Sequence, residues 1–132
     1  METTIPIFRA LIVSDTEGIY HVYHGQLGFA LKDKKQPNWE EANSELTKAI
    51  EIRGSWQTTQ SRLFYEYNRA ICQIHLDKDF IVKQKSTDEA KKRILADLQA
   101  ANSSTLKSDI IAYDPIIKEW LSLNGMKKVP PL

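Results

Sequence analysis

Apolar residues recur along this chain at spacings of three and four positions, and no stretch shows sustained alternation between apolar and polar residues. Short breaks rich in charged residues, glycine or proline separate the segments with this spacing. The pattern predicts an all-α protein in which short loops join antiparallel helices. The helices are expected at about 19–31, 38–53, 58–79 and 86–102, followed by 105–113 and a last helix at 114–124.

Residues that favour helix ends stand at several of these boundaries. A small polar side chain can cap the first turn of a helix, whereas glycine readily adopts the left-handed conformation that often follows the last turn. Helix starts are accordingly predicted at Asn38, at a capping box from Ser86 to Glu89 and at Asp114 with Pro115, and helix ends are predicted at Gly54 and Gly125.

The two ends of the chain carry less regular patterns. The run from Ile5 to Val13 is apolar, but it contains Arg9 and is far too short to cross a bilayer. We therefore expect a short segment that packs against the rest of the domain. Residues 127–132 are predicted to form a loose tail.

Length and composition limit the classes of function. The chain has 132 residues, which at roughly 100 to 200 residues per domain predicts a single domain over 1–132. Its 18 Lys and Arg against 17 Asp and Glu give a net charge of +1, which argues against nucleic acid and membranes as partners. The single cysteine, Cys72, allows no internal disulfide and suits the reducing cytoplasm, where we expect the protein to act.

Small residues recur where two consecutive helices would meet. Gly28, Ala42 and Ala49 would let the first two helices approach closely, with Leu46 filling the space between them. A second, less regular set comprises Tyr67, Asn68, Arg69 and Ala70 on one helix and Ile94, Asp97, Leu98 and Ala101 on the next. Over about residues 19–102 the chain thereby resembles a tetratricopeptide repeat (TPR) protein.

The resemblance implies two helical hairpins, at about 19–54 and 58–102, and a capping region at 105–124 that covers the apolar end of the stack. Relative to a repeat of about 34 residues, the second unit carries an insertion of about a dozen residues. The insertion includes 80–85, which could extend the helix, form a lid or be disordered.

The resemblance also implies a concave groove, lined by the first helix of each pair, that holds a peptide or a helix of a partner. The chain would then be a non-catalytic adaptor, scaffold or subunit that needs no cofactor or metal. Asn68 would hydrogen-bond a peptide backbone, whereas Gly25 and Phe29 replace the other residues with which some family members clamp a carboxylate. The groove residues would be Val22, Gln26, Phe29, Phe64, Asn68, Ile71 and His75.

A closed bundle is the alternative to an open groove. Apolar stripes at helical spacing are usually core, so the N-terminal segment or the last helix could cover Phe29, Phe64 and Ile71. In that case the protein would be a structural subunit of a larger assembly, and its interaction surface would be an apolar end of the stack.

Catalysis is a further alternative. Arg69 and His75 resemble the Arg-x(4–6)-His signature of metal-independent HEPN-type ribonucleases, but six positions place them about 240° apart around one helix. His21 and His24 have a spacing that can hold a metal, without a third His or Cys at supporting spacing. Since phosphate-loop, serine-elbow and His-Glu-x-x-His motifs are absent, we expect no enzyme. The basic cluster 91–93 is interpreted as a solvated helix face.

Overall fold

The computed structural model describes residues 4–18, 20–54, 65–103 and 114–130. Within these ranges every regular element is a helix, which confirms the all-α prediction. The expected 105–113 helix and Phe64 lie outside the described residues. The described helices are α1 (Ile5–Ser14), α2 (His21–Asp33), α3 (Trp39–Arg53), α5 (Tyr65–Leu76), α6 (Lys78–Lys83), α7 (Asp88–Ser103) and α8 (Pro115–Leu123).

Local capping explains where α3 and α8 begin and end, as predicted. The Asn38 side chain accepts a hydrogen bond from the Glu41 N–H at 3.1 Å, and Gly54 ends α3 with a φ of 84°. The Asp114 side chain accepts from the Ile116 N–H at 2.9 Å, with Pro115 in the first turn of α8. Gly125, at φ 80°, follows that helix. Both glycines occupy left-handed backbone that other residues rarely adopt.

The capping box predicted from Ser86 to Glu89 is wrong by one residue. Thr87 takes the capping role, because its Oγ1 accepts from the Ala90 N–H at 3.2 Å. The Ser86 hydroxyl is used in a tertiary contact instead: it donates to Asp77 at 2.5 Å and accepts from the Trp120 indole at 2.8 Å. A contact with α8 therefore decides which of two adjacent hydroxyls caps α7.

The segment predicted as one helix over 58–79 is interrupted where the structure describes it. Helix α5 ends at Leu76, and the Asp77 side chain accepts from the Phe80 N–H to cap the separate short helix α6. Phe80 anchors α6 because its side chain is buried in the core. Residues 80–83 thus neither extend the preceding helix nor lack structure, and Gln84 ends α6 at a φ of 59°.

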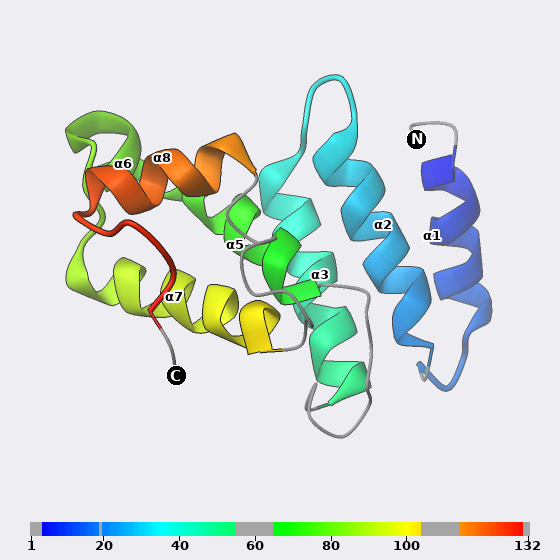
Figure 1. Ribbon diagram of the computed structural model, residues 1–132. Coiled ribbons are helices and arrows are strands. Elements are labelled where there is room, and N and C mark those ends of the chain that lie inside the picture. Colours follow the sequence, from blue (N-terminus) through cyan, green and yellow to red (C-terminus); the bar gives the residue numbers. More distant parts are fainter. Residues whose placement is uncertain (1–3, 19, 55–64, 104–113, 131–132) are drawn as a thin grey trace.

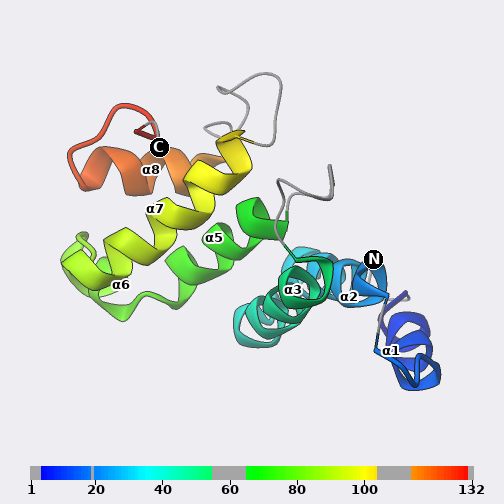
Figure 2. The ribbon, with the colours of Figure 1, turned by 90° about the horizontal axis from the view of Figure 1, so that it is seen from below.

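The helices are arranged around α5 (Figures 1 and 2). Helices α2 and α3 lie side by side and run in opposite directions, and α1 packs on the outer side of α2 (Figure 1). Helix α5 packs mainly against α3 on one side and α7 on the other, with limited contact to α2. Two buried clusters result, one shared by α2, α3 and α5 and the other by α5 to α8.

The small residues occupy helix contacts, as predicted. A Cβ at Gly28 would lie 2.8 Å from Leu46 Cγ and 3.3 Å from the Ala42 carbonyl oxygen, so only glycine fits there without movement. Ala42, Ala49 and Ala70 are fully buried, and Ala101 is nearly so.

Both ends of the described chain pack against the domain. Helix α1 confirms the packed N-terminal segment, although its inward side chains, Ile5, Phe8 and Ile12, are only partly buried. The predicted loose tail is corrected at Val129, which is buried in the core, and at Pro130, whose carbonyl accepts from Gln99 at 3.2 Å. None of the described helices has the length and apolar character needed to cross a lipid bilayer.

Candidate functional site

The residues predicted to line a groove lie in different settings. Val22 is 41% exposed on α2, whereas Ile71 of α5 is 3% exposed. Ile71 belongs to the buried cluster that includes Ile117 and Trp120 of α8, which is the covered arrangement expected of a closed bundle. Its position is therefore in the core rather than on an open face.

The other groove residues that the structure describes are half-buried. Phe29 lies beside the ring of Tyr65, with 5.8 Å between ring centroids. His75 stacks flat on Trp39, with centroids 3.8 Å apart and planes 4° from parallel. Gln26 and Asn68 are half-buried on α2 and α5. Because α5 packs mainly on α3, the structure does not bring the described members of this set together on one open surface.

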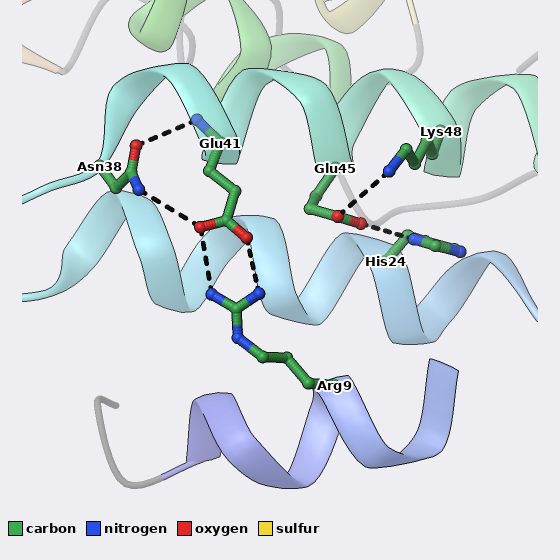
Figure 3. A network of polar contacts seen from close by, with 6 residues as sticks. All are labelled: Arg9, His24, Asn38, Glu41, Glu45 and Lys48. Carbon is green, nitrogen blue, oxygen red and sulfur yellow. Dashed lines mark hydrogen bonds and ion pairs between the residues drawn. The ribbon is translucent and has the colours of Figure 1, made fainter. Parts of the chain in front are cut away.

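The two histidines considered as metal ligands contact separate partners. His21 Nδ1 lies 2.7 Å from the Tyr65 hydroxyl, and burial lowers the pKa of His21. His24 Nδ1 lies 2.6 Å from a carboxylate oxygen of Glu45 on α3 (Figure 3). Among the described residues, no group of three His, Cys, Asp or Glu side chains is placed to hold a metal ion.

Arg69 and His75 also contact different helices. The Arg69 guanidinium makes a two-pronged ion pair with Asp97 of α7, at 2.7 Å from each carboxylate oxygen. His75 stacks on Trp39 at the start of α3, and burial lowers the pKa of its imidazole. The cation proposed to hold phosphate is thus already neutralised by a buried carboxylate.

A polar pocket of about 440 Å³ lies between α3, α5 and α7. This volume is within the range of about 300 to 1,000 Å³ typical of small-ligand sites. The Arg69–Asp97 ion pair lies in this pocket, and Gln73 adds a hydrogen bond from Nε2 to Asp97 at 2.8 Å. The lining residues are Asn43, Thr47, Arg69, Gln73, Leu76, Asp77, Arg93, Ala96 and Asp97.

Two acceptors on residues that line this pocket lack hydrogen-bond partners within the described part of the chain. Asn43 Oδ1 and Gln73 Oε1 are buried, and neither has a partner among the described residues. The orientation of the Gln73 amide follows from Asp97, because a carboxylate accepts from the NH₂ group and would repel the amide oxygen. A buried acceptor without a donor costs about 1 to 3 kcal/mol, so these two oxygens favour a ligand that supplies donors.

The rim of the pocket is exposed and carries charge. Leu76 and Arg93 are exposed, so the pocket opens to solvent beside them. Asp77 accepts from the Phe80 N–H at 3.2 Å and from the Ser86 hydroxyl at 2.5 Å. Arg93 forms no hydrogen bond or ion pair within the part of the chain that the structure describes.

The sequence analysis missed this pocket, although its residues follow a simple spacing. Each helix contributes a polar pair four positions apart, which places both side chains on one helix face. The pairs are Asn43 and Thr47 on α3, Arg69 and Gln73 on α5, and Arg93 and Asp97 on α7. Such pairs are common on solvated helices, and only the packing of three helices distinguishes them here.

No protein-family model, curated protein or solved structure matches the chain.

Proposed function

We propose that this chain is a non-catalytic protein-interaction module, an adaptor or subunit, that binds an extended peptide segment of a partner in the polar pocket between α3, α5 and α7. The observation that carries the proposal is the pair of buried, partnerless amide oxygens on Asn43 and Gln73. Peptide N–H groups are neutral donors, and an extended chain presents them at every second residue on one side. Both oxygens are closed to solvent in the unbound structure, so a segment lying in the pocket would supply their missing donors once the two amide side chains turn toward it.

The charges in the pocket favour binding over chemistry. Arg69 is neutralised by Asp97, and the residues that line the pocket include no His or Cys to transfer a proton or attack a substrate. The close α2–α3 pair, with Gly28 against Leu46, supports a TPR-like architecture, whose usual role is to hold peptides. The lone, buried Cys72 supports a cytoplasmic location for this module.

The proposed site differs from the groove expected between α2 and α5. Val22 is the most exposed described member of that groove, and it belongs to α2, whereas the polar pocket is lined by α3, α5 and α7. Substitutions at Val22 and at Asn43 therefore distinguish the two surfaces.

A peptide selection on the folded chain tests the proposal. Peptides enriched from a displayed random library would be measured by calorimetry against the unmodified chain, Asn43→Ala, Val22→Ser and the matched control Ser44→Ala, which alters an exposed neighbour on α3. We expect Asn43→Ala to weaken binding about 3- to 10-fold, the value of one hydrogen bond, with the other two variants unchanged. If Val22→Ser loses binding while Asn43→Ala binds fully, the peptide site lies on the exposed face of α2 rather than in the polar pocket.

A further inference from the structure

We infer that the peptide segment bound in the polar pocket is acidic, and that Arg93 recognises its carboxylate. The inference rests on the proposed function, since it names the chemistry of the segment that the pocket would hold. It makes Arg93 the residue that determines specificity, whereas Asn43 and Gln73 would bind the peptide backbone of any sequence.

The saturation of Asp97 leaves Arg93 without a partner. Arg93 and Asp97 are four positions apart on α7, a spacing at which an arginine and a carboxylate can pair. Both oxygens of Asp97 are already used, one by Arg69 and the other by Arg69 and Gln73. The pocket thus contains a cation whose carboxylate neighbour inside the pocket, Asp97, is bonded to other donors, while Glu89, four positions away on the other side along α7, is exposed and does not line the pocket.

The other carboxylate in the pocket is also occupied. Asp77 uses one oxygen to cap α6 through the Phe80 N–H and the other to accept from the Ser86 hydroxyl. Ser86 is in turn fixed by the Trp120 indole, so Asp77 is held in its capping position. Its carboxylate serves α6 and α7 rather than Arg93.

A carboxylate on the ligand completes this set of charges. The planar guanidinium of arginine matches a carboxylate through two parallel hydrogen bonds. Phosphate groups, which carry nearly two charges, are usually bound by clusters of arginines. Two arginines line this pocket, and Arg69 is neutralised by Asp97, so Arg93 is the one that has no partner among the described residues. A single available arginine favours a singly charged carboxylate over a phosphate group. A glutamate or aspartate side chain at the rim is therefore the expected contact.

The sequence offers a matched control for Arg93. Lys92 precedes it on α7, is exposed and does not line the pocket. Arg93→Ala and Lys92→Ala remove the same charge from the same helix, so they separate recognition in the pocket from general attraction between a basic helix and an acidic peptide. Arg93→Lys keeps the charge and removes the two-pronged geometry.

The test is a nitrogen-15 NMR titration of the full chain with three terminally blocked, alanine-based hexapeptides that carry two central glutamates, glutamines or lysines. We expect all three to shift amide signals of α3, α5 and α7 around the pocket, with the glutamate peptide binding roughly five-fold more tightly than the glutamine peptide. Arg93→Ala should abolish this preference, Arg93→Lys should reduce it, and Lys92→Ala should retain it.

The contrary outcomes separate the inference from the proposed function. Equal binding of the glutamate and glutamine peptides at the pocket would overturn acidic recognition and leave the peptide-binding function standing. An equal loss in Lys92→Ala and Arg93→Ala would also overturn it, in favour of diffuse attraction. If none of the peptides shifts signals around the pocket, the proposed function fails together with the inference.

Discussion

The ring of Tyr65 occupies the space that a side chain at position 25 would need. A Cβ on Gly25 would lie 2.2 Å from Tyr65 Cε1 and 2.7 Å from its hydroxyl oxygen. The ring is fully buried, its hydroxyl contacts His21, and burial raises the pKa of Tyr65 to about 12. Gly25 is therefore needed on α2 to accept an aromatic ring from α5, even though glycine is a poor helix former.

Gly25→Ala should lower the free energy of unfolding. The added methyl group must displace a ring held by burial and by His21, a type of overpacking that costs about 1 to 3 kcal/mol. Better helix propensity returns at most about 1 kcal/mol of this. Urea denaturation measures the change, with Ser44→Ala as an exposed helical control.

A double-mutant cycle identifies the ring as the cause. Gly25→Ala should cost less in a Tyr65→Leu background, because the shorter side chain leaves room for the methyl group. Unchanged or increased stability of Gly25→Ala in the unmodified background would contradict the close contact.

Glu66→Gln should be among the most destabilising polar substitutions in the chain. Arg53 at the end of α3 and Glu66 at the start of α5 form an ion pair whose side chains are only 2% and 9% exposed. Removing one charge leaves the other buried and uncompensated, which costs about 3 to 5 kcal/mol. Chemical denaturation measures this loss.

A half-exposed ion pair provides the comparison for that variant. Lys48 lies 3.4 Å from Glu45, but half of the lysine side chain is exposed, so Lys48→Ala should cost less than about 1 kcal/mol. Replacing both buried partners, as in Arg53→Met with Glu66→Leu, should cost less than Glu66→Gln alone. A cost for Glu66→Gln no larger than that for Lys48→Ala would show that the pair is not buried in solution.

The stacked His75 should make stability fall in acid. Burial lowers its native pKa below the ordinary 6.5, against an opposing effect of Asp114 and with a smaller contribution from Lys32. The unfolded chain therefore binds a proton more readily than the native protein. Stability is full above the unfolded pKa, declines as the pH falls below about 6.5, and reaches its lower level below the native pKa.

His75→Phe isolates this effect, because phenylalanine can still stack on Trp39 but does not titrate. Urea denaturation from pH 8 to pH 5 should show a smaller decline for the variant than for the unmodified chain. His21 also has a pKa lowered by burial and titrates in both proteins, so the difference between the two curves reports on His75. Parallel curves would mean that His75 is equally easy to protonate in both states.

Local residue chemistry predicted much of the fold. Asn38, Gly54, Asp114 and Gly125 act at helix ends as expected, because capping depends on a few neighbouring atoms. The positions of the buried alanines and of Gly28 at helix contacts were also predictable, since small residues at helical spacing allow two helices to pack closely. The Ser86 prediction failed because a partner 34 positions away, Trp120, engages its hydroxyl.

The candidate site depends on tertiary packing that local patterns do not encode. Ile71 would have the same helical spacing in a groove and in a core. Only its membership of the buried cluster with Ile117 and Trp120 shows that it belongs to the core. No sequence pattern pointed to the position of Tyr65, although Gly25, an unusual residue inside a helix, lies where the Tyr65 ring packs. Asn43, Gln73 and Asp97 form one pocket because α5 lies between α3 and α7.

Exchanging the charges of Arg9 and Glu41 should show how α1 is held. Arg9 binds both oxygens of Glu41, at 2.7 and 3.1 Å, and this pairing lowers the pKa of Glu41 (Figure 3). The apolar residues of α1 are only partly buried, so a modest ion pair is a sizeable part of its docking energy. Arg9→Glu should speed hydrogen exchange of the α1 amides roughly three- to ten-fold, without a comparable change in α5.

Glu41→Arg should destabilise the protein more than Arg9→Glu does, because Glu41 has a second role. It stands in the first turn of α3, where negative charge is favoured, and it accepts a hydrogen bond from the Asn38 amide at 3.3 Å. Glu41→Arg alone should therefore destabilise α3 as well as α1. Arg9→Glu combined with Glu41→Arg should restore most of the α1 protection at low salt, since opposite charges again face each other. If the combined variant exchanges as fast as Arg9→Glu, apolar contacts rather than the ion pair hold α1.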